Sequence, residues 1–251
     1  FRKFNFDGTN KIIICSGTST PRILDTSYSV TNVNATGSAN FKFVEIFKNQ
    51  IFFSGDSSNS QSVKFMGTAQ TNDFTTGNGG GELKVDSPVV GLKVFRDNLF
   101  IFCLDSIFKL VGSSSSDFAL QPVTRKIGCL DGRSIQEFGG DVIFLAPDGL
   151  RTIAATDKIG DVELGTISKQ VQEIIDSITT HNINSLVIRS KSQYRLFYPT
   201  GANQSEDSSK ALVCVIKGQP QGGAGFEFSE LEGLKVSSSD SDFILYDWFK
   251  N

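Results

Sequence analysis

The sequence is poor in the residues on which most enzyme centres depend. Its 251 residues include one histidine, His181, and one tryptophan, Trp248. A single histidine removes most metal centres and the usual Ser-His-Asp and Cys-His forms of catalysis. His181 stands between Thr180 and Asn182, and this polar context predicts a solvated loop residue. The scarcity of tryptophan also disfavours a sugar site, because sugars commonly stack on aromatic faces.

The cysteines do not have the spacing of a metal site. Cys15, Cys103, Cys129 and Cys214 never lie within two to four residues of one another, so a zinc knuckle is excluded. Three of them, at positions 15, 103 and 214, stand inside apolar runs. We therefore predict buried free thiols, which fit a reducing compartment.

Other ligand-binding patterns are incomplete. The glycine-rich run 77–81 has no Lys-Ser/Thr after it, so it is not a phosphate-binding loop. Asp240 and Asp242 lack the glycine and the distal glutamate of a calcium loop, and a solvated turn is the simpler interpretation. We predict no catalytic, cofactor-binding or metal-binding residues, no cofactor, and no enzymatic activity.

Charge and hydropathy disfavour two further classes of protein. The chain has 24 basic and 27 acidic side chains, a net charge of −3, without a Lys/Arg cluster. This balance does not favour tight binding of phosphates over a broad surface. The longest apolar stretch, residues 99–104, is far shorter than a membrane span, and no signal-peptide pattern opens the chain. We expect no membrane span.

What the sequence does have is phenylalanine and a repeat. Phe occurs 22 times, and it favours strands without bringing a polar group that needs a buried partner. A pattern of strand, polar turn and strand recurs at intervals of about 40 to 50 residues, the period of four-stranded propeller blades. The five copies cover residues 44–53, 92–102, 135–145, 186–197 and 234–245, and a weaker sixth copy covers residues 10–14.

The repeat predicts an all-β fold, a β-propeller of four-stranded blades. A parallel sheet would need a helix between successive strands, and only one good helix is present. The copies predict five to six blades, with six favoured, in a single domain over residues 1–251. Pairing of residues 247–249 with the strand at 12–14 would close the ring.

The one predicted helix runs from Ser168 to Ser177. Apolar residues at helical spacing give it one apolar face, and Thr166 or Ser168 is a candidate for its N-terminal cap. We predict a short surface helix near 166–178 that packs beside one blade, with a partner-binding helix as the alternative.

Several short sequence segments from position 88 to 178, most of them predicted strands, resemble those of a known family. They comprise 88–102, 106–112, Ile127-Gly128-Cys129, the run 138–149 that ends in Pro147-Asp148-Gly149, and Ile167-Ser168. In this order they resemble the tail nozzle, or tail tubular protein B, of short-tailed bacteriophages. Known members of that family are usually much longer than this chain.

The resemblance implies a function. A nozzle protein is a structural component of the virion tail, assembled in the host cytoplasm. Commonly six copies form a homo-oligomeric ring beneath the tail adaptor and next to the tail fibre or needle proteins. The ring holds the end of the genome and passes the DNA during ejection without sequence-specific binding.

Two other functions stay open. A carbohydrate-binding or carbohydrate-active propeller would use paired carboxylates and exposed aromatic rings, and 27 acidic residues are available. A phage would use such a propeller in host recognition. An intracellular interaction propeller is less favoured, because the Gly-His and Trp-Asp signatures of that class are missing.

Overall fold

The computed structural model resolves the fold in two compact units, each described here by itself. Unit 1 contains Phe1–Arg125 and unit 2 contains Lys126–Phe243. The residues that the structure describes are 1–154, 166–178, 183–200, 209–218, 224–234 and 236.

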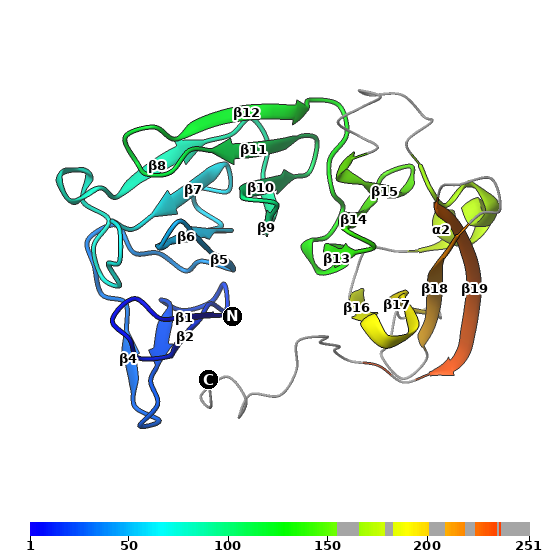
Figure 1. The fold of residues 1–251 in the computed structure, drawn as a ribbon, viewed down its shortest axis with the longest axis horizontal. Coiled ribbons are helices and arrows are strands. Elements are labelled where there is room, and N and C mark those ends of the chain that lie inside the picture. The colour runs from blue at the N-terminus through cyan, green and yellow to red at the C-terminus, as the bar shows by residue number, and fades with distance from the viewer. Residues whose placement is uncertain (155–165, 179–182, 201–208, 219–223, 235, 237–251) are drawn as a thin grey trace. The chain divides into compact units, whose positions relative to one another are not determined.

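Unit 1 consists of three four-stranded antiparallel sheets in chain order (Figure 1). Each strand pairs with the next one along the chain. Sheet A contains β1 (Arg2–Phe4), β2 (Lys11–Ile14), β3 (Arg22–Leu24) and β4 (Val30–Asn32). Sheet B contains β5 (Phe43–Phe47), β6 (Gln50–Ser54), β7 (Ser62–Phe65) and β8 (Gly81–Lys84), with the 3-10 turn η1 (Thr76–Asn78) before β8. Sheet C contains β9 (Val89–Phe95), β10 (Asn98–Cys103), β11 (Ile107–Val111) and β12 (Ala119–Thr124).

Unit 2 contains two further antiparallel sheets and the helix. Sheet D contains β13 (Gln136–Phe138), β14 (Asp141–Ala146) and β15 (Gly149–Thr152). Sheet E contains β16 (Asn184–Ile188), β17 (Gln193–Pro199), β18 (Ser209–Gly218) and β19 (Ala224–Leu234). The helical segments are η2 (Gly132–Ser134), η4 (Lys169–Val171), α2 (Gln172–Ser177) and η5 (Arg189–Lys191).

Within each unit the sheets pack face to face, and the hydrophobic cores lie between them. In β6, Ile51 and Phe53 belong to the core between sheets A and B, whereas Phe52 belongs to the core between sheets B and C. A strand covered on both faces needs a continuous apolar run, and β6 and β10 supply such runs. In unit 2, Ile143 of β14 and Leu196 of β17 share the core between sheets D and E.

This architecture is that of a β-propeller. Within each unit, successive antiparallel meanders stack face to face and the first strands of neighbouring sheets contact one another, as strands at the inner edge of propeller blades do. The chain is therefore an all-β propeller with one short α-helix and five blades among the described residues. In sheet D the fourth position is marked by a single antiparallel bridge between Arg151 and Thr166.

The repeat is confirmed in the described part of the chain. The copies at 44–53, 92–102, 135–145 and 186–197 are the hairpins that open sheets B to E, and the weak copy at 10–14 is β2 of sheet A. The copy at 234–245, on which the sixth blade depends, lies mostly outside the described residues.

Three of these hairpins turn through two residues with positive φ. They are Lys48-Asn49, Arg96-Asp97 and Gly139-Gly140. Positive φ at both central residues matches the right-handed twist of the flanking strands, which explains the tight turns. For lysine and arginine this conformation is strained, and each of the two cations lies over the ring of the preceding phenylalanine, at 5.6 and 5.0 Å.

Two details differ from the expectations. The predicted pairing of residues 247–249 with the strand at 12–14 is wrong for that strand, because β2 already has β1 on one side and β3 on the other. Residues 247–249 themselves lie outside the described residues. A single domain over residues 1–251 stays a prediction.

The predicted helix is confirmed, but its capping differs. It begins as η4 and continues as α2, and its apolar side chains, including Ile175, pack on the core between sheets D and E. Ser168 stands at the N-cap position of η4, but its side chain makes no capping hydrogen bond. The Ser168 hydroxyl accepts a hydrogen bond from the Leu150 amide, and the Thr166 hydroxyl donates to Asp148.

Candidate functional site

Strand β15, directly after the turn at Pro147-Asp148, carries the most unusual side chain of the described chain, a buried arginine. Arg151 is 1% exposed, and its guanidinium donates to both carboxylate oxygens of Asp148, at 2.8 and 2.5 Å. Its Nη1 has no hydrogen-bond partner in the described part of the chain. A buried cation is costly unless it is paired, so Asp148 is needed to keep Arg151 inside.

Asp148 remains ionised at neutral pH. Partial burial opposes ionisation, but the hydrogen bonds from Arg151 and Thr166 outweigh it and hold the pKa of the Asp148 carboxyl below its ordinary value. The Thr166 hydroxyl lies 3.0 Å from Asp148 Oδ2. The carboxylate is thus fixed on two sides.

The backbone beneath Asp148 is equally constrained. Gly149 has φ +131°, and a Cβ at this position would clash with the Ser168 hydroxyl, so only glycine fits. That hydroxyl accepts from the Leu150 amide at 2.9 Å, and the Ile167 amide donates to the Leu150 carbonyl at 2.8 Å. The segment before α2 is therefore bound to the turn through backbone groups.

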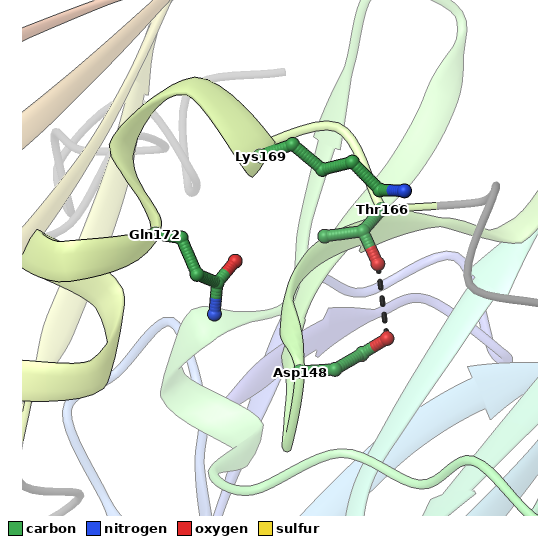
Figure 2. Close-up of a pocket in the computed structure, with 4 residues that line it drawn as sticks. All are labelled: Asp148, Thr166, Lys169 and Gln172. Carbon is green, nitrogen blue, oxygen red and sulfur yellow. Dashed lines mark hydrogen bonds between the residues drawn. The ribbon is translucent and has the colours of Figure 1, made fainter.

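A cavity of about 380 Å³ opens beside this turn, lined by Asp148, Thr166, Lys169 and Gln172. Figure 2 shows the Gln172 amide facing the Thr166–Asp148 pair, with Lys169 above them. The Gln172 amide nitrogen donates to Asp176 at 2.8 Å, which directs its hydrogen bonding toward the helix. The cavity combines one ammonium, one neutralised carboxylate and two neutral polar groups, so it suits a small polar group rather than an apolar one.

A second cavity, of about 350 Å³, lies where the first hairpins of sheets D and E meet. Phe138, Val187 and Ile216 give it an apolar side, and Glu137 and Arg189 are its charged groups. Among the described residues, each of the two cavities is lined by a single carboxylate, so the described lining does not supply the facing pair of carboxylates that a glycosidase needs.

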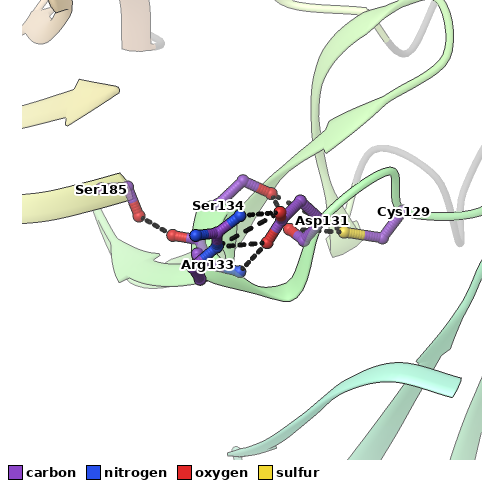
Figure 3. A network of polar contacts seen from close by, with 5 residues as sticks. All are labelled: Cys129, Asp131, Arg133, Ser134 and Ser185. Carbon is purple, nitrogen blue, oxygen red and sulfur yellow. Dashed lines mark hydrogen bonds and ion pairs between the residues drawn. The ribbon is translucent and has the colours of Figure 1, made fainter. Parts of the chain in front are cut away.

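The loop that enters sheet D forms a network of polar contacts (Figure 3). The Cys129 thiol donates to the Asp131 carbonyl at 3.3 Å, and the Ser134 hydroxyl donates to the same carbonyl at 2.6 Å. Arg133 pairs with the Asp131 carboxylate at 2.7 Å, and its carbonyl accepts from the Ser185 hydroxyl of sheet E at 2.5 Å. These contacts bind the loop to both sheets.

Two more hydrogen bonds complete this network in the interior. The Leu145 amide donates to the Ser134 hydroxyl at 3.0 Å, and the fully buried Tyr194 hydroxyl donates to the Ser134 carbonyl at 2.9 Å. Because its buried polar groups have partners, the network acts as a support for sheets D and E.

The cysteines match the prediction of free thiols. All four are free; Cys103, Cys129 and Cys214 are buried, whereas Cys15 is only partly buried. Burial raises the pKa of the Cys15, Cys103 and Cys214 thiols to about 12. Since the thiolate is the reactive form, these three are poor nucleophiles at neutral pH.

The remaining candidates from the sequence fall in different places. His181, Trp248, Asp240 and Asp242 lie outside the described residues. The glycine run 77–81 forms the end of η1 and the start of β8. The described ranges contain no group of three or more potential metal ligands and no helix long and apolar enough to cross a membrane.

Sequence reasoning missed the Asp148–Arg151 pair. The residue types of Pro147-Asp148-Gly149 predict only a tight turn, and an arginine two residues after it gives no sign of burial. The one available signal in the sequence is the spacing: an aspartate and an arginine three residues apart across a tight turn can form an ion pair.

No known protein family matches the chain, and no curated protein matches it by sequence. Several solved structures are similar to it in fold. Hsv2p of Kluyveromyces lactis is similar at 11% identity over 92% of this chain and 73% of that chain, with a TM-score of 0.48.

Two bacterial structures are also similar in fold. A quinonprotein alcohol dehydrogenase-like protein of Bacteroides thetaiotaomicron has 10% identity over 92% of this chain and a TM-score of 0.49, and this chain covers only 57% of it. BamB from Moraxella catarrhalis has 11% identity over 93% of this chain and 74% of that chain, with a TM-score of 0.39.

Proposed function

We propose that this chain is a non-enzymatic structural protein of a phage virion, a subunit of the tail nozzle. In this proposal several copies, six by the family resemblance, form a ring that retains the genome and passes it during ejection. The ring would contact the tail adaptor and the fibre or needle proteins.

The observation that carries the proposal is where the resembling residues lie. Cys129 belongs to the network that binds the loop to sheets D and E. Gly149 is a position that accepts only glycine, and Ser168 binds the backbone of β15. The segments that resemble the nozzle family therefore belong to the framework of the blades. This supports a shared architecture with a structural role.

The charge of the chain supports the part of the proposal that concerns DNA. A protein with a net charge of −3 neutralises few phosphates, so it gains little from counterion release. A channel that lets DNA pass needs weak binding of this kind.

The test is to locate the chain in the particle. Cryo-electron microscopy of virions, with an epitope tag on this chain detected by gold-labelled antibody, should show a ring on the tail axis. Virions in which another tail protein carries the same tag are the matched control. Label outside the tail, or a single copy without a ring, would refute the proposal.

The alternative is a carbohydrate-binding propeller used in host recognition. The cavity beside Asp148 offers polar groups for hydroxyls, but the four described residues that line it include no aromatic ring. A glycan array that responds to one sugar, and loses the response in Lys169→Met, would favour this alternative over the nozzle.

A further inference from the structure

The first hairpins of sheets D and E meet around the cavity of about 350 Å³. Gln136 of β13 binds the two hairpins together, because its side-chain amide donates to the Ser185 carbonyl of β16 at 3.1 Å. The rings of Phe138 and Tyr194 lie 6.2 Å apart in the core that the two sheets share. The cavity is therefore pre-formed by hairpins that packing and hydrogen bonds hold in place, as most ligand sites are.

One side of the cavity is apolar. Phe138 is 5% exposed, Val187 is 9% exposed, and Ile216 is partly buried against the same core. Each of the three side chains also lines the cavity. A ligand group that covers them removes apolar surface from water, which favours an apolar group at this position.

Two opposite charges border the same cavity. Glu137 of β13 and Arg189, the first residue of η5, both line it, and both residues are exposed. Within the described part of the chain, neither side chain forms an ion pair or a hydrogen bond, with each other or with a third residue. The carboxylate and the guanidinium are therefore both available to a ligand, and together they favour a ligand that carries charges of both signs.

The size of the cavity favours a small molecule. A volume of about 350 Å³ lies near the lower end of the range for ligand cavities, which is about 300 to 1,000 Å³. The cavity beside Asp148 has a similar volume, but the four described residues that line it are all polar. Of the two cavities, the one between the hairpins therefore combines, in its described lining, an apolar side with two opposite unpaired charges.

We propose that this cavity binds a small zwitterion with an apolar side chain, of which an apolar α-amino acid is the simplest. The ammonium group of the ligand pairs with the Glu137 carboxylate. The carboxylate of the ligand pairs with Arg189, whose planar guanidinium matches the geometry of a carboxylate. The apolar side chain packs on Phe138, Val187 and Ile216. This inference goes beyond the proposed role in a tail nozzle and does not depend on it.

The first test is an NMR titration of the purified chain with L-phenylalanine. We expect saturable shifts of the backbone amide signals of Gly139, Gly140 and Ser192, which line the cavity. L-serine has the same charges without the apolar side chain, and N-acetyl-L-phenylalanine amide has the side chain without the charges. Each should bind at least about ten-fold more weakly.

Two outcomes of this titration would overturn the inference. If no saturable shift occurs at these amides, the cavity does not bind the amino acid. If the uncharged amide binds as well as L-phenylalanine, the charges do not select the ligand, and the cavity fits an apolar side chain of a partner protein instead. A ring of this chain on the tail axis, found together with either outcome, would leave the nozzle proposal intact.

Two variants test which charge each residue recognises. Glu137→Gln should weaken the binding of L-phenylalanine at least about ten-fold, but it should not change the weaker binding of 3-phenylpropionate, which lacks the ammonium group. Arg189→Gln should likewise weaken L-phenylalanine and not phenethylamine, which lacks the carboxylate. Glu173→Gln and Arg96→Gln, at exposed positions outside the cavity, are the matched controls and should have no effect.

The comparison of ligands separates a lost ion pair from a damaged cavity. If a variant weakens L-phenylalanine and its own control compound equally, the residue does not recognise the charge assigned to it, and the inference is wrong. Unchanged melting temperatures of the variants are expected, because both side chains are exposed and make no ion pair in the described part of the chain.

Discussion

The two partners of the Arg151–Asp148 ion pair differ in solvent exposure, and this difference decides how much stability is lost when either one is changed. The Arg151 side chain is 2% exposed and the Asp148 side chain is 43% exposed. Removing the carboxylate leaves a buried cation without compensation, a change that typically costs several kcal/mol. The exposed Lys48–Asp97 pair, in which the Asp97 side chain is 87% exposed, has no such cost.

We predict that Asp148→Asn lowers the free energy of unfolding of unit 2 by about 3 kcal/mol. Asp97→Asn, the control in an exposed pair, should change the stability of unit 1 by less than about 1 kcal/mol. Urea denaturation followed by hydrogen exchange, which reports each unit separately, measures both. Equal effects of the two variants would show that Arg151 does not depend on Asp148.

The same pair predicts a dependence on pH. Because the folded state lowers the pKa of Asp148, its contribution is fully present above the ordinary value of 3.8 and is lost as the pH falls through the folded value. The urea midpoint of unit 2 should therefore fall below about pH 4. Asp148→Asn should make this fall smaller. An identical pH profile for the variant would contradict the role given to this carboxylate.

Gly139 and Gly140 provide a matched pair of substitutions in one turn. Both have positive φ, but a Cβ on Gly139 would clash with Ile216, whereas a Cβ on Gly140 would meet nothing within 4 Å. Gly140→Ala should cost about 1 kcal/mol, the strain of the left-handed conformation, and Gly139→Ala about 2 kcal/mol or more. Thermal denaturation would reveal the difference. A smaller effect at Gly139 would mean that Ile216 moves aside freely.

At the scale of elements, the second strands of sheets B, C and D are buried over nearly their whole length. β14 is buried over Val142–Ala146, and its Ile143 is fully buried in the core between sheets D and E. Ile143→Ala should cost about 2 to 5 kcal/mol and reduce amide protection in both sheets. Val30→Ala, on the exposed edge of sheet A, should change stability by less than about 0.5 kcal/mol in the monomer. Loss of protection in sheet D alone would show that the two sheets do not share one core.

The sequence allowed these second strands to be predicted because burial on both faces gives a continuous apolar run, as in residues 99–103. The helix was predicted for the same kind of reason, since its apolar residues follow one face. The outer strands gave a much weaker signal. β4 is exposed throughout, so it shows no alternation, and β12 contains a proline that argues against a strand.

The candidate site was predicted less well than the fold. The residue types of Pro147-Asp148-Gly149 favour a tight turn, but the cavity beside it depends on Thr166, Lys169 and Gln172, which come from the segment after the sheet. Their approach is set by tertiary packing through Ser168, whose hydroxyl binds the Leu150 amide instead of capping the helix. No local pattern reports such a contact.

At the scale of the whole molecule, the balance of charge is the property with the clearest functional consequence. The net charge is −3, and several cations are already paired, such as Lys48 with Asp97 and Lys210 with Glu230. A net negative charge repels the phosphates of DNA, and affinity for duplex DNA depends chiefly on the displacement of counterions by cationic side chains. A ring that passes a genome benefits from this weakness.

We therefore predict that the purified protein binds duplex DNA with a dissociation constant weaker than about 10⁻⁴ M at physiological salt. Fluorescence anisotropy with a labelled duplex measures this. A variant with Glu137, Asp97 and Glu173 all changed to lysine is the positive control, and its binding should weaken steeply as salt is raised. If the unchanged protein binds DNA tightly with the same steep salt dependence, it grips the nucleic acid through its phosphates, and the passive channel is the wrong description of its role.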